Sequence, residues 1–262
     1  MWRHDMQKKL LTVNQLKKHF YVKPHLLKRG HLIEAVKDVS FELFEGDILG
    51  IIGESGSGKT TLGEIILKLQ TPTSGSIRFE NLEKRFRSEV QIVMQQSSEV
   101  FDPLASVDRV LREAIQKHHK IKGYELEERV DKLLESVGLS PVDKLKRIHQ
   151  FSGGQLQRVC IARALAVSPR IVLLDEPVSA LDVSVQGQII NLLMRLHKES
   201  HLTYIIISHD LNVIKHMCNR IAVMKEGEIV EINDAKTLFK APEHPYTKQL
   251  IEQFLIVEYG DD

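Results

Sequence analysis

The chain has 262 residues, a length that suits one α/β unit with an inserted subdomain. Its 36 basic and 35 acidic residues leave a formal charge of +1, so overall charge gives no indication of a nucleic-acid partner. The sequence has no apolar run near 18 residues, so we expect neither a secretory leader nor a membrane span and expect the chain to be soluble by itself.

The N-terminal part is predicted to be rich in β-strands. Apolar patterning predicts strands over residues 10–22 and 33–43, joined by a loop that carries Pro24, Arg29 and Gly30. Residues 1–32 are locally basic, which favours a solvated strand face and loop; a membrane-surface or regulatory patch is the alternative.

The most informative motif is Gly53-Glu54-Ser55-Gly56-Ser57-Gly58-Lys59-Thr60, which fits the phosphate-binding pattern G-x-x-x-x-G-K-[ST]. A buried strand over 47–52 is expected before it and a helix over 61–69 after it. This order places an anion at a helix N-terminus, where orphan N–H groups and the helix dipole favour negative charge. Glycines let the backbone curl closely around a phosphate, so the motif predicts binding of a nucleoside triphosphate.

The middle of the chain is predicted to be helical. After strands over 75–79 and 90–94, helical periodicity covers 107–118 and 125–137 within a helical subdomain assigned to residues 103–168. From residue 169 the pattern alternates again, which favours a mostly parallel sheet with crossover helices. The elements expected there are strands 170–174 and 203–207, helix 183–198, a hairpin over 220–224 and 228–232, and two C-terminal helices.

Four further motifs follow the phosphate-binding loop in order. Ser152-Gly153-Gly154-Gln155 precedes a helix, and an N-cap with flexible turn residues is an alternative explanation of this string. Asp175 and Glu176 end a buried apolar run, at the edge where α/β sheets bind ligands. Ser179-Ala180-Leu181-Asp182 and Ile207-Ser208-His209-Asp210 come next.

This ordered set closely resembles the ATP-binding subunit of ABC transporters over essentially the whole chain. The resemblance implies a single ABC ATPase domain over residues 1–262, with a P-loop NTPase fold of class α/β. Its mostly parallel core would carry an antiparallel β subdomain within residues 10–100 and the inserted helical subdomain. Residues 169–262 would complete the ATPase core.

The resemblance also implies residue roles in binding ATP with Mg²⁺. Glu176 would act as general base, His209 and Gln95 would position γ-phosphate and water, and Lys59 would neutralise phosphate charge. Thr60, Gln95 and Asp175 would hold Mg²⁺; a register error of one residue would move the glutamine's role to Gln96. Adenine would stack on Phe20, with Tyr21 as the alternative. The remaining ATP contacts would come from Gly53, Glu54, Ser55, Gly56, Ser57, Gly58, Lys59, Thr60 and Thr61.

A second group of residues would act on a partner. By resemblance, Ser152, Gly153, Gly154 and Gln155 contact the ATP held by a second subunit in a head-to-tail dimer, and Asp182 lies across that interface. The partner would be a related but distinct ATPase, with a homodimer as the alternative. The segment around Phe101 to Val107 would receive a coupling helix from the membrane subunits.

The string His244-Pro245-Tyr246-Thr247-Lys248-Gln249-Leu250 resembles ATPases of oligopeptide, dipeptide and nickel or metallophore importers. This branch implies two permease subunits, an extracytoplasmic binding protein and a peripheral location on the cytoplasmic face of the membrane. Export, or a soluble ABC ATPase acting on ribosomes or DNA, remain as alternative classes. Cys160 and Cys218 are predicted to lie inside helices and lack metal-ligand spacing. Neither lies in the C-terminal tail, so no iron–sulfur cluster is expected.

Overall fold

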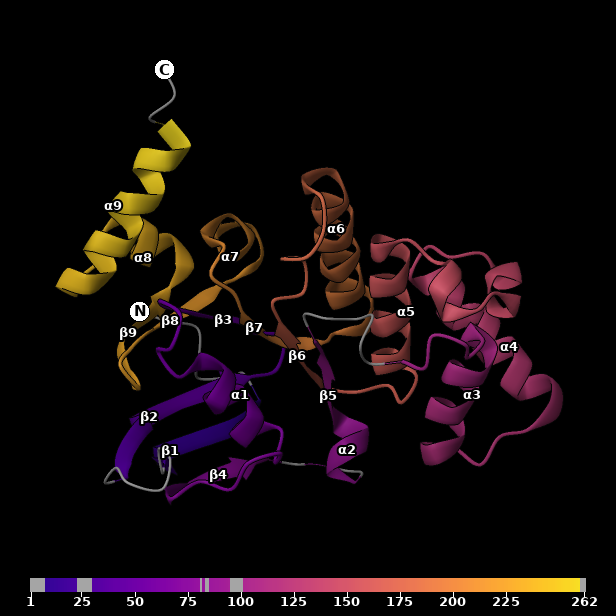
Figure 1. Ribbon diagram of the computed structural model, residues 1–262, viewed down its shortest axis with the longest axis horizontal. Coiled ribbons are helices and arrows are strands. Elements are labelled where there is room, and N and C mark those ends of the chain that lie inside the picture. The colour runs from indigo at the N-terminus through magenta and orange to yellow at the C-terminus, as the bar shows by residue number, and fades with distance from the viewer. Residues whose placement is uncertain (1–7, 23–29, 81, 83–84, 95–100, 260–262) are drawn as a thin grey trace. The chain divides into compact units, whose positions relative to one another are not determined.

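The computed structural model describes residues 8–22, 30–80, 82, 85–94 and 101–259 (Figure 1). The chain divides into two compact units. The first consists of Met1–Asn81 and Ile205–Asp262, and the second of Leu82–Tyr204.

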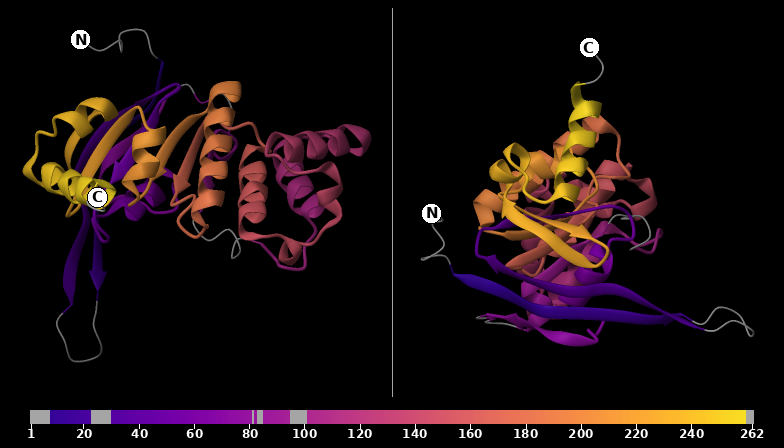
Figure 2. Two further views of the ribbon diagram at one scale, coloured as in Figure 1. Left: turned by 90° about the horizontal axis from the view of Figure 1, so that it is seen from above. Right: turned by 90° about the vertical axis from the view of Figure 1, so that its left-hand side faces the viewer.

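The first unit contains a three-stranded antiparallel sheet. Its strands are β1 (Lys9–Val22), β2 (His31–Phe44) and β4 (Ser74–Phe79), in the order β2-β1-β4. Figure 2 shows β1 and β2 running together as a long ribbon. All three strands were predicted, with ends displaced by one or two residues. Pro24 and Arg29 of the expected connecting loop lie outside the described residues.

The first unit also carries the parallel strands that lead to the phosphate-binding loop. β3 (Ile48–Ile52) pairs in parallel with β8 (Arg220–Lys225), and β8 forms the predicted hairpin with β9 (Glu228–Asp234). The buried Asp47 carboxylate anchors this edge by accepting from the Arg220 guanidinium at 2.7 Å. The helices of the unit are α1 (Lys59–Ile66), α7 (Leu211–Met217), α8 (Ala235–Lys240) and α9 (Pro245–Tyr259).

The second unit combines a parallel strand pair with the helical subdomain. β5 (Val90–Val93) pairs with β6 (Ile171–Asp175). β7 (Thr203–Ile207) begins in this unit and ends in the first: Thr203 N–H donates to Arg170 at 2.9 Å, and Ser208 N–H donates to Ile51 at 3.4 Å. The helices are α2 (Phe86–Glu89), α3 (Val107–His118), α4 (Gly123–Ser136), η2 (Pro141–Leu145), η3 (Ile148–Gln150), α5 (Gly153–Leu165) and α6 (Val183–Ser200).

Residue patterns explain these elements. Every residue of β3 and of β7 is buried, as expected for parallel strands covered on both faces. The buried side chains of α3, Val107, Leu111 and Ile115, recur at helical spacing, while most of its other residues are polar. The Ser106 hydroxyl begins this helix by accepting from Arg109 N–H at 3.2 Å.

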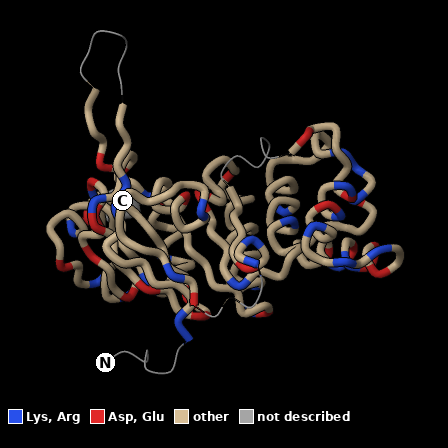
Figure 3. Tube along the Cα trace, turned by 90° about the horizontal axis from the view of Figure 1, so that it is seen from below, with Lys and Arg blue, Asp and Glu red and all other residues tan. Residues whose placement is uncertain are grey.

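Charged residues of both signs are interleaved along α3 and α4, as the blue and red segments of the trace in Figure 3 show. Within α3, Arg109 pairs with Glu113 and Arg112 pairs with Asp108. Among the described helices, none combines the length and apolar character that a membrane span requires.

Both cysteines are buried thiols. Cys160 lies within α5 as predicted, whereas Cys218 directly follows α7 and is not inside a helix. A Cβ on Gly50 would lie 2.8 Å from the Cys218 sulfur, so this thiol fills a space that a glycine in β3 leaves open.

Candidate active site

The phosphate-binding loop runs from β3 into α1, and two of its glycines pack directly against backbone carbonyl groups of β2 and β8. Gly53 (φ 149°) and Gly58 (φ 101°) take backbone conformations that favour glycine. A Cβ on Gly53 would lie 2.1 Å from the Met224 carbonyl oxygen, and one on Gly58 would lie 2.1 Å from that of Ala35. Both positions therefore require glycine for two independent reasons.

We expect Gly58→Ala to destabilise the fold by at least about 2 kcal/mol, because a strained φ and a backbone collision act together. Urea unfolding measures the change. Gly187→Ala in α6 is the matched control: its Cβ would meet nothing within 4 Å, and alanine favours a helix by about 1 kcal/mol. Equal stability of Gly58→Ala and the unaltered chain would contradict this packing.

The loop opens onto the N-terminus of α1, which suits an anion. A Cβ on Gly56 (φ 80°) would meet nothing within 4 Å, and no acidic side chain lies in the first turn of α1. First-turn N–H groups lack partners within their helix and attract negative charge. The residues present therefore fit the phosphate chain of a nucleotide.

The Lys59 ammonium is held across the loop. Its Nζ donates to the carbonyls of Gly53 and Glu54, both at 2.8 Å, and lies 3.4 Å from the Ser57 hydroxyl. The side chain is only 8% exposed, so a fixed positive charge sits within the phosphate-binding loop. Thr60, the next residue, is exposed at the start of α1.

His209 follows β7 in the same unit and is exposed. The residues around it are fixed by hydrogen bonds: Asp210 N–H donates to the Ser208 hydroxyl at 3.0 Å, and the Asp210 carboxylate caps α7 by accepting from Asn212 N–H at 2.8 Å. The backbone that carries His209 is therefore anchored on both sides.

The two candidate adenine-stacking residues lie on opposite faces of β1, because successive side chains of a strand alternate. Phe20 is half-buried, with the Lys18 ammonium 4.9 Å from its ring centre. Tyr21 is 63% exposed, and its ring lies against Gly30, where a Cβ would be 2.5 Å away. Phe20 remains our choice for the adenine contact.

The second unit presents the adjacent carboxylates at the end of β6. Asp175 is the last residue of the strand, and Glu176 follows with a left-handed φ of 48°. A non-glycine residue with this conformation is uncommon and often marks a functional site. The buried Gln157 amide of α5 donates to the Pro177 carbonyl at 2.8 Å, which links the turn after the carboxylates to α5.

Ser152 begins α5 through a capping box. Its hydroxyl accepts from Gln155 N–H at 3.4 Å, and the Gln155 side chain accepts from Ser152 N–H at 3.1 Å. A Cβ on Gly154 would lie 2.4 Å from a Val185 methyl group, and one on Gly153 would lie 3.3 Å from Leu181. The glycine pair therefore packs closely on the segment around Asp182, and Ser152, Gly153 and Asp182 are exposed.

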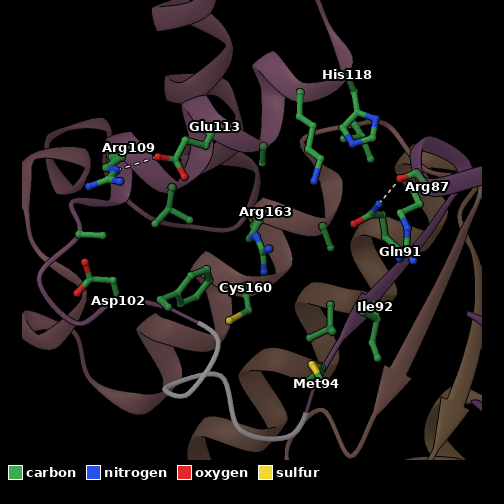
Figure 4. Close-up of a pocket in the computed structure, with 18 residues that line it drawn as sticks. Arg87, Gln91, Ile92, Met94, Asp102, Arg109, Glu113, His118, Cys160 and Arg163 are labelled. Atoms are coloured by element: carbon green, nitrogen blue, oxygen red, sulfur yellow. Dashed lines mark hydrogen bonds and ion pairs between the residues drawn. The ribbon is translucent and has the colours of Figure 1, made fainter. Parts of the chain in front are cut away.

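A groove of about 470 Å³ lies in the second unit between β5, α3 and α5 (Figure 4). Phe101 and Ala105 of the segment 101–107 line it, and the Arg163 guanidinium lies 5.5 Å from the Phe101 ring centre. The groove is lined by apolar side chains, among them Ile92, Met94 and Val110, and also by charged side chains. The charged lining residues are Arg87, Arg109, Lys117 and Arg163 with Asp102 and Glu113.

The first unit thus holds Phe20, the phosphate-binding loop and His209, and the second holds Asp175, Glu176, Ser152–Gln155 and Asp182. Gln95 and Gln96 lie outside the described residues. Sequence reasoning missed the contact of Tyr246 with this loop: the Tyr246 hydroxyl accepts from Glu54 N–H at 3.1 Å. The only available signal was the string 244–250, whose pattern does not indicate what it touches.

Comparisons with known proteins cover nearly the whole chain. The family model described as "ABC transporter" matches residues 36–179. The oligopeptide transport ATP-binding protein OppF of Bacillus subtilis (strain 168) is 42% identical over 257 residues, covering 94% of this chain and 82% of that protein. The glutathione import ATP-binding protein GsiA of Escherichia coli (strain K12) is 39% identical over 259 residues, covering 95% of this chain but 42% of that longer protein.

Solved structures agree with the fold described above. A dimeric ATP-binding cassette in a post-hydrolysis state, bound to ADP and Pi, has a TM-score of 0.74 and 29% identity, covering 86% of this chain and 99% of that one. The structure of cbiO1 from Clostridium perfringens, part of the ABC transporter complex cbiONQ, has a TM-score of 0.76 and 27% identity, covering 97% of both chains. The predicted fold class is thereby confirmed.

Proposed function

The chain belongs to the ABC transporter family as an ATP-hydrolysing subunit, and from that premise we propose that it energises an importer of peptides or of nickel and other metal chelates. The observation that carries the importer proposal is the 40–42% identity, over 94% of this chain, to ATP-binding proteins of oligopeptide transport. Two named relatives serve peptide transport and glutathione import. This supports peptides as the cargo; nickel rests on the family resemblance alone.

For the chemistry, we propose that the loop 53–61 holds the phosphates of ATP, with Lys59 neutralising the β- and γ-phosphates. ATP supplies the phosphoanhydride bond that is broken. Glu176 accepts the proton of the attacking water, and His209 with Gln95 orients that water and the γ-phosphate. Thr60, Asp175 and Gln95 would hold Mg²⁺ through the oxygen ligands that this ion prefers, and the bound ion would neutralise phosphate charge.

We further propose a head-to-tail dimer in which Ser152, Gly153, Gly154 and Gln155 contact the ATP of the partner. The support is local: the capping box leaves the N-terminus of α5 ordered and exposed, which suits an anion arriving from another molecule. Asp182, exposed at the start of α6, would lie in the same interface. A related but distinct ATPase is the proposed partner.

The groove of the second unit is the proposed docking site for a cytoplasmic segment of the permeases. Its apolar lining suits the apolar face of a short helix, and its excess of basic side chains suits acidic residues beside that face. Two permease subunits and an extracytoplasmic binding protein complete the assembly. The chain would then work at the cytoplasmic face of the membrane as a peripheral subunit.

The groove proposal predicts that Ala114→Trp, which fills the groove from α3, breaks permease association without changing ATP affinity more than about twofold. The assay is a pull-down of tagged chain from native membranes in mild detergent with ATP, read by mass spectrometry. Glu135→Trp is the matched control, since it adds the same side chain at an exposed position of α4 outside the groove. Permease recovery equal to that of the control would contradict docking in this groove.

The same pull-down, performed with the unaltered chain, tests the importer proposal. Recovery of two permeases with a related ATPase would support it. Recovery of ribosomal or DNA-repair proteins alone would overturn it while leaving the ATPase activity intact.

A further inference from the structure

The string 244–250 forms the start of α9 and is fixed in place by one buried carboxylate. Glu231 of β9 is 9% exposed, and its two oxygens accept from Glu243 N–H at 3.1 Å and from His244 N–H at 2.9 Å. Burial favours a raised pKa for this carboxyl, but these donors outweigh burial and its pKa is lowered. Both Glu231 oxygens thereby hold the backbone that leads into α9.

The start of α9 then orients Tyr246. Pro245 occupies the first helical position, where its missing N–H and fixed φ suit a helix start. The His244 ring accepts from Tyr246 N–H at 3.1 Å, and the Lys225 ammonium lies 4.8 Å from the Tyr246 ring centre. The Tyr246 side chain is 5% exposed, so its ring is enclosed and its hydroxyl has a defined direction.

That hydroxyl reaches the phosphate-binding loop at one peptide group. Glu54 N–H donates to the Tyr246 hydroxyl at 3.1 Å, and the Gly53 carbonyl of the same peptide group accepts from Lys59 Nζ at 2.8 Å. Rotation of this peptide group would move the carbonyl that holds the Lys59 ammonium. Tyr246 is therefore connected to Lys59 through a single rigid plane.

The loop is supported at its other side by the β8–β9 turn. Gly227 N–H donates to the Ser57 carbonyl at 3.0 Å, and Ser57 N–H donates back to the Glu54 carbonyl at 3.2 Å. Lys225, which lies over the Tyr246 ring, belongs to the same hairpin. The segment from Glu54 to Ser57 is thus fixed by backbone at one end and by the Tyr246 hydroxyl at the other.

We propose that Tyr246 is a positioning residue for ATP binding: its hydroxyl fixes the Gly53–Glu54 peptide group and, through it, the placement of Lys59. This gives the string 244–250 a direct role at the nucleotide site. The inference rests on ATP binding by the loop, and it is independent of which cargo the transporter carries.

The first test is Tyr246→Phe, which removes only the hydroxyl. We expect the dissociation constant of a fluorescent ATP analogue for the full chain to rise about fivefold to tenfold, because a backbone donor loses its partner and the loop loosens. Tyr204→Phe is the matched control: Tyr204 is a buried tyrosine whose hydroxyl donates to Leu193 at 3.1 Å, in the second unit. The two variants are expected to lose similar melting temperature, and only Tyr246→Phe to lose affinity.

A double-mutant cycle separates positioning from a general loss of stability. If Tyr246 acts through Lys59, Tyr246→Phe in a Lys59→Ala background will weaken ATP binding by less than about twofold further. Full additivity of the two changes would overturn the proposed route through Lys59. Unchanged or tighter ATP binding by the single Tyr246→Phe variant would overturn the proposal as a whole.

A measurement on the unaltered chain tests the proposal even if the Tyr246→Phe variant does not fold. Amide hydrogen exchange followed by NMR is expected to show the Glu54 amide protected at least about tenfold over an open loop amide. Exchange of Glu54 at the unprotected rate would overturn the proposal. A chain that binds no ATP yet protects Glu54 would instead count against the nucleotide function, so the two failures are distinguishable.

Discussion

Replacing Glu176 with glutamine is expected to lower ATP turnover by about 10²- to 10⁴-fold, because a general base contributes an acceleration of that size. The amide keeps the size of the side chain and loses the ability to accept a proton. ATP binding should remain within about threefold, because in our proposal the phosphates are held by the loop 53–61, in the other unit. Steady-state phosphate release and equilibrium nucleotide binding measure the two effects.

The same variant should accumulate as a dimer in the presence of ATP, because two nucleotides that are not hydrolysed keep the proposed interface closed. Size-exclusion chromatography with and without ATP reports this. Glu199→Gln is the matched control: Glu199 is exposed on α6 and pairs only with Arg195 among the interactions described, so its turnover should be normal. Rapid hydrolysis by Glu176→Gln would remove Glu176 from the role of base.

The second large effect is expected at Lys59. Lys59→Ala should weaken ATP binding by about 10- to 100-fold, because it removes a buried, fixed ammonium that in our proposal neutralises the phosphate charge. It also leaves the Gly53 and Glu54 carbonyls without a donor that the structure places 2.8 Å away. Titration of a fluorescent ATP analogue measures the affinity.

Lys68→Ala provides the control for charge. Lys68 is exposed just beyond the end of α1, with its ammonium near the Phe79 ring, so the substitution removes one positive charge from the same unit. Its ATP affinity should stay within about twofold of normal. Equal affinities for Lys59→Ala and the unaltered chain would contradict the assignment of the loop.

Much of this fold was predictable because local signals and burial agree. The β3 and β7 strands are apolar runs buried on both faces. The N-cap Ser106 marks the start of α3, and its apolar residues recur at helical spacing. The helix after the phosphate-binding loop was predicted to start at Thr61 and starts at Lys59, because the loop itself supplies the first turn. Short elements such as α2, with four residues, carry too little periodicity to be predicted.

The motifs of the site were predictable from the sequence, but the distant residues that pack against them were not. Glycine at positions 53 and 58 is a local signal, but the carbonyls of Met224 and Ala35 that exclude a Cβ come from distant strands. The left-handed conformation of Glu176 could not be predicted, since the residue is neither glycine nor asparagine, the types that favour a positive φ. The Tyr246 contact joins residues 192 positions apart, and no spacing rule relates them.

The claim that ATP hydrolysis on this chain drives import is tested most directly in proteoliposomes that contain this chain with its co-purified membrane subunits, with ATP enclosed and the binding protein added outside. We expect the vesicles to accumulate members of a short-peptide mixture, or a nickel chelate, only with enclosed ATP, and complexes carrying Glu176→Gln to accumulate none. Uptake that proceeds equally with Glu176→Gln would contradict the claim that hydrolysis on this chain drives import. Cargo moving out of the compartment that holds ATP would contradict it equally, since that is export.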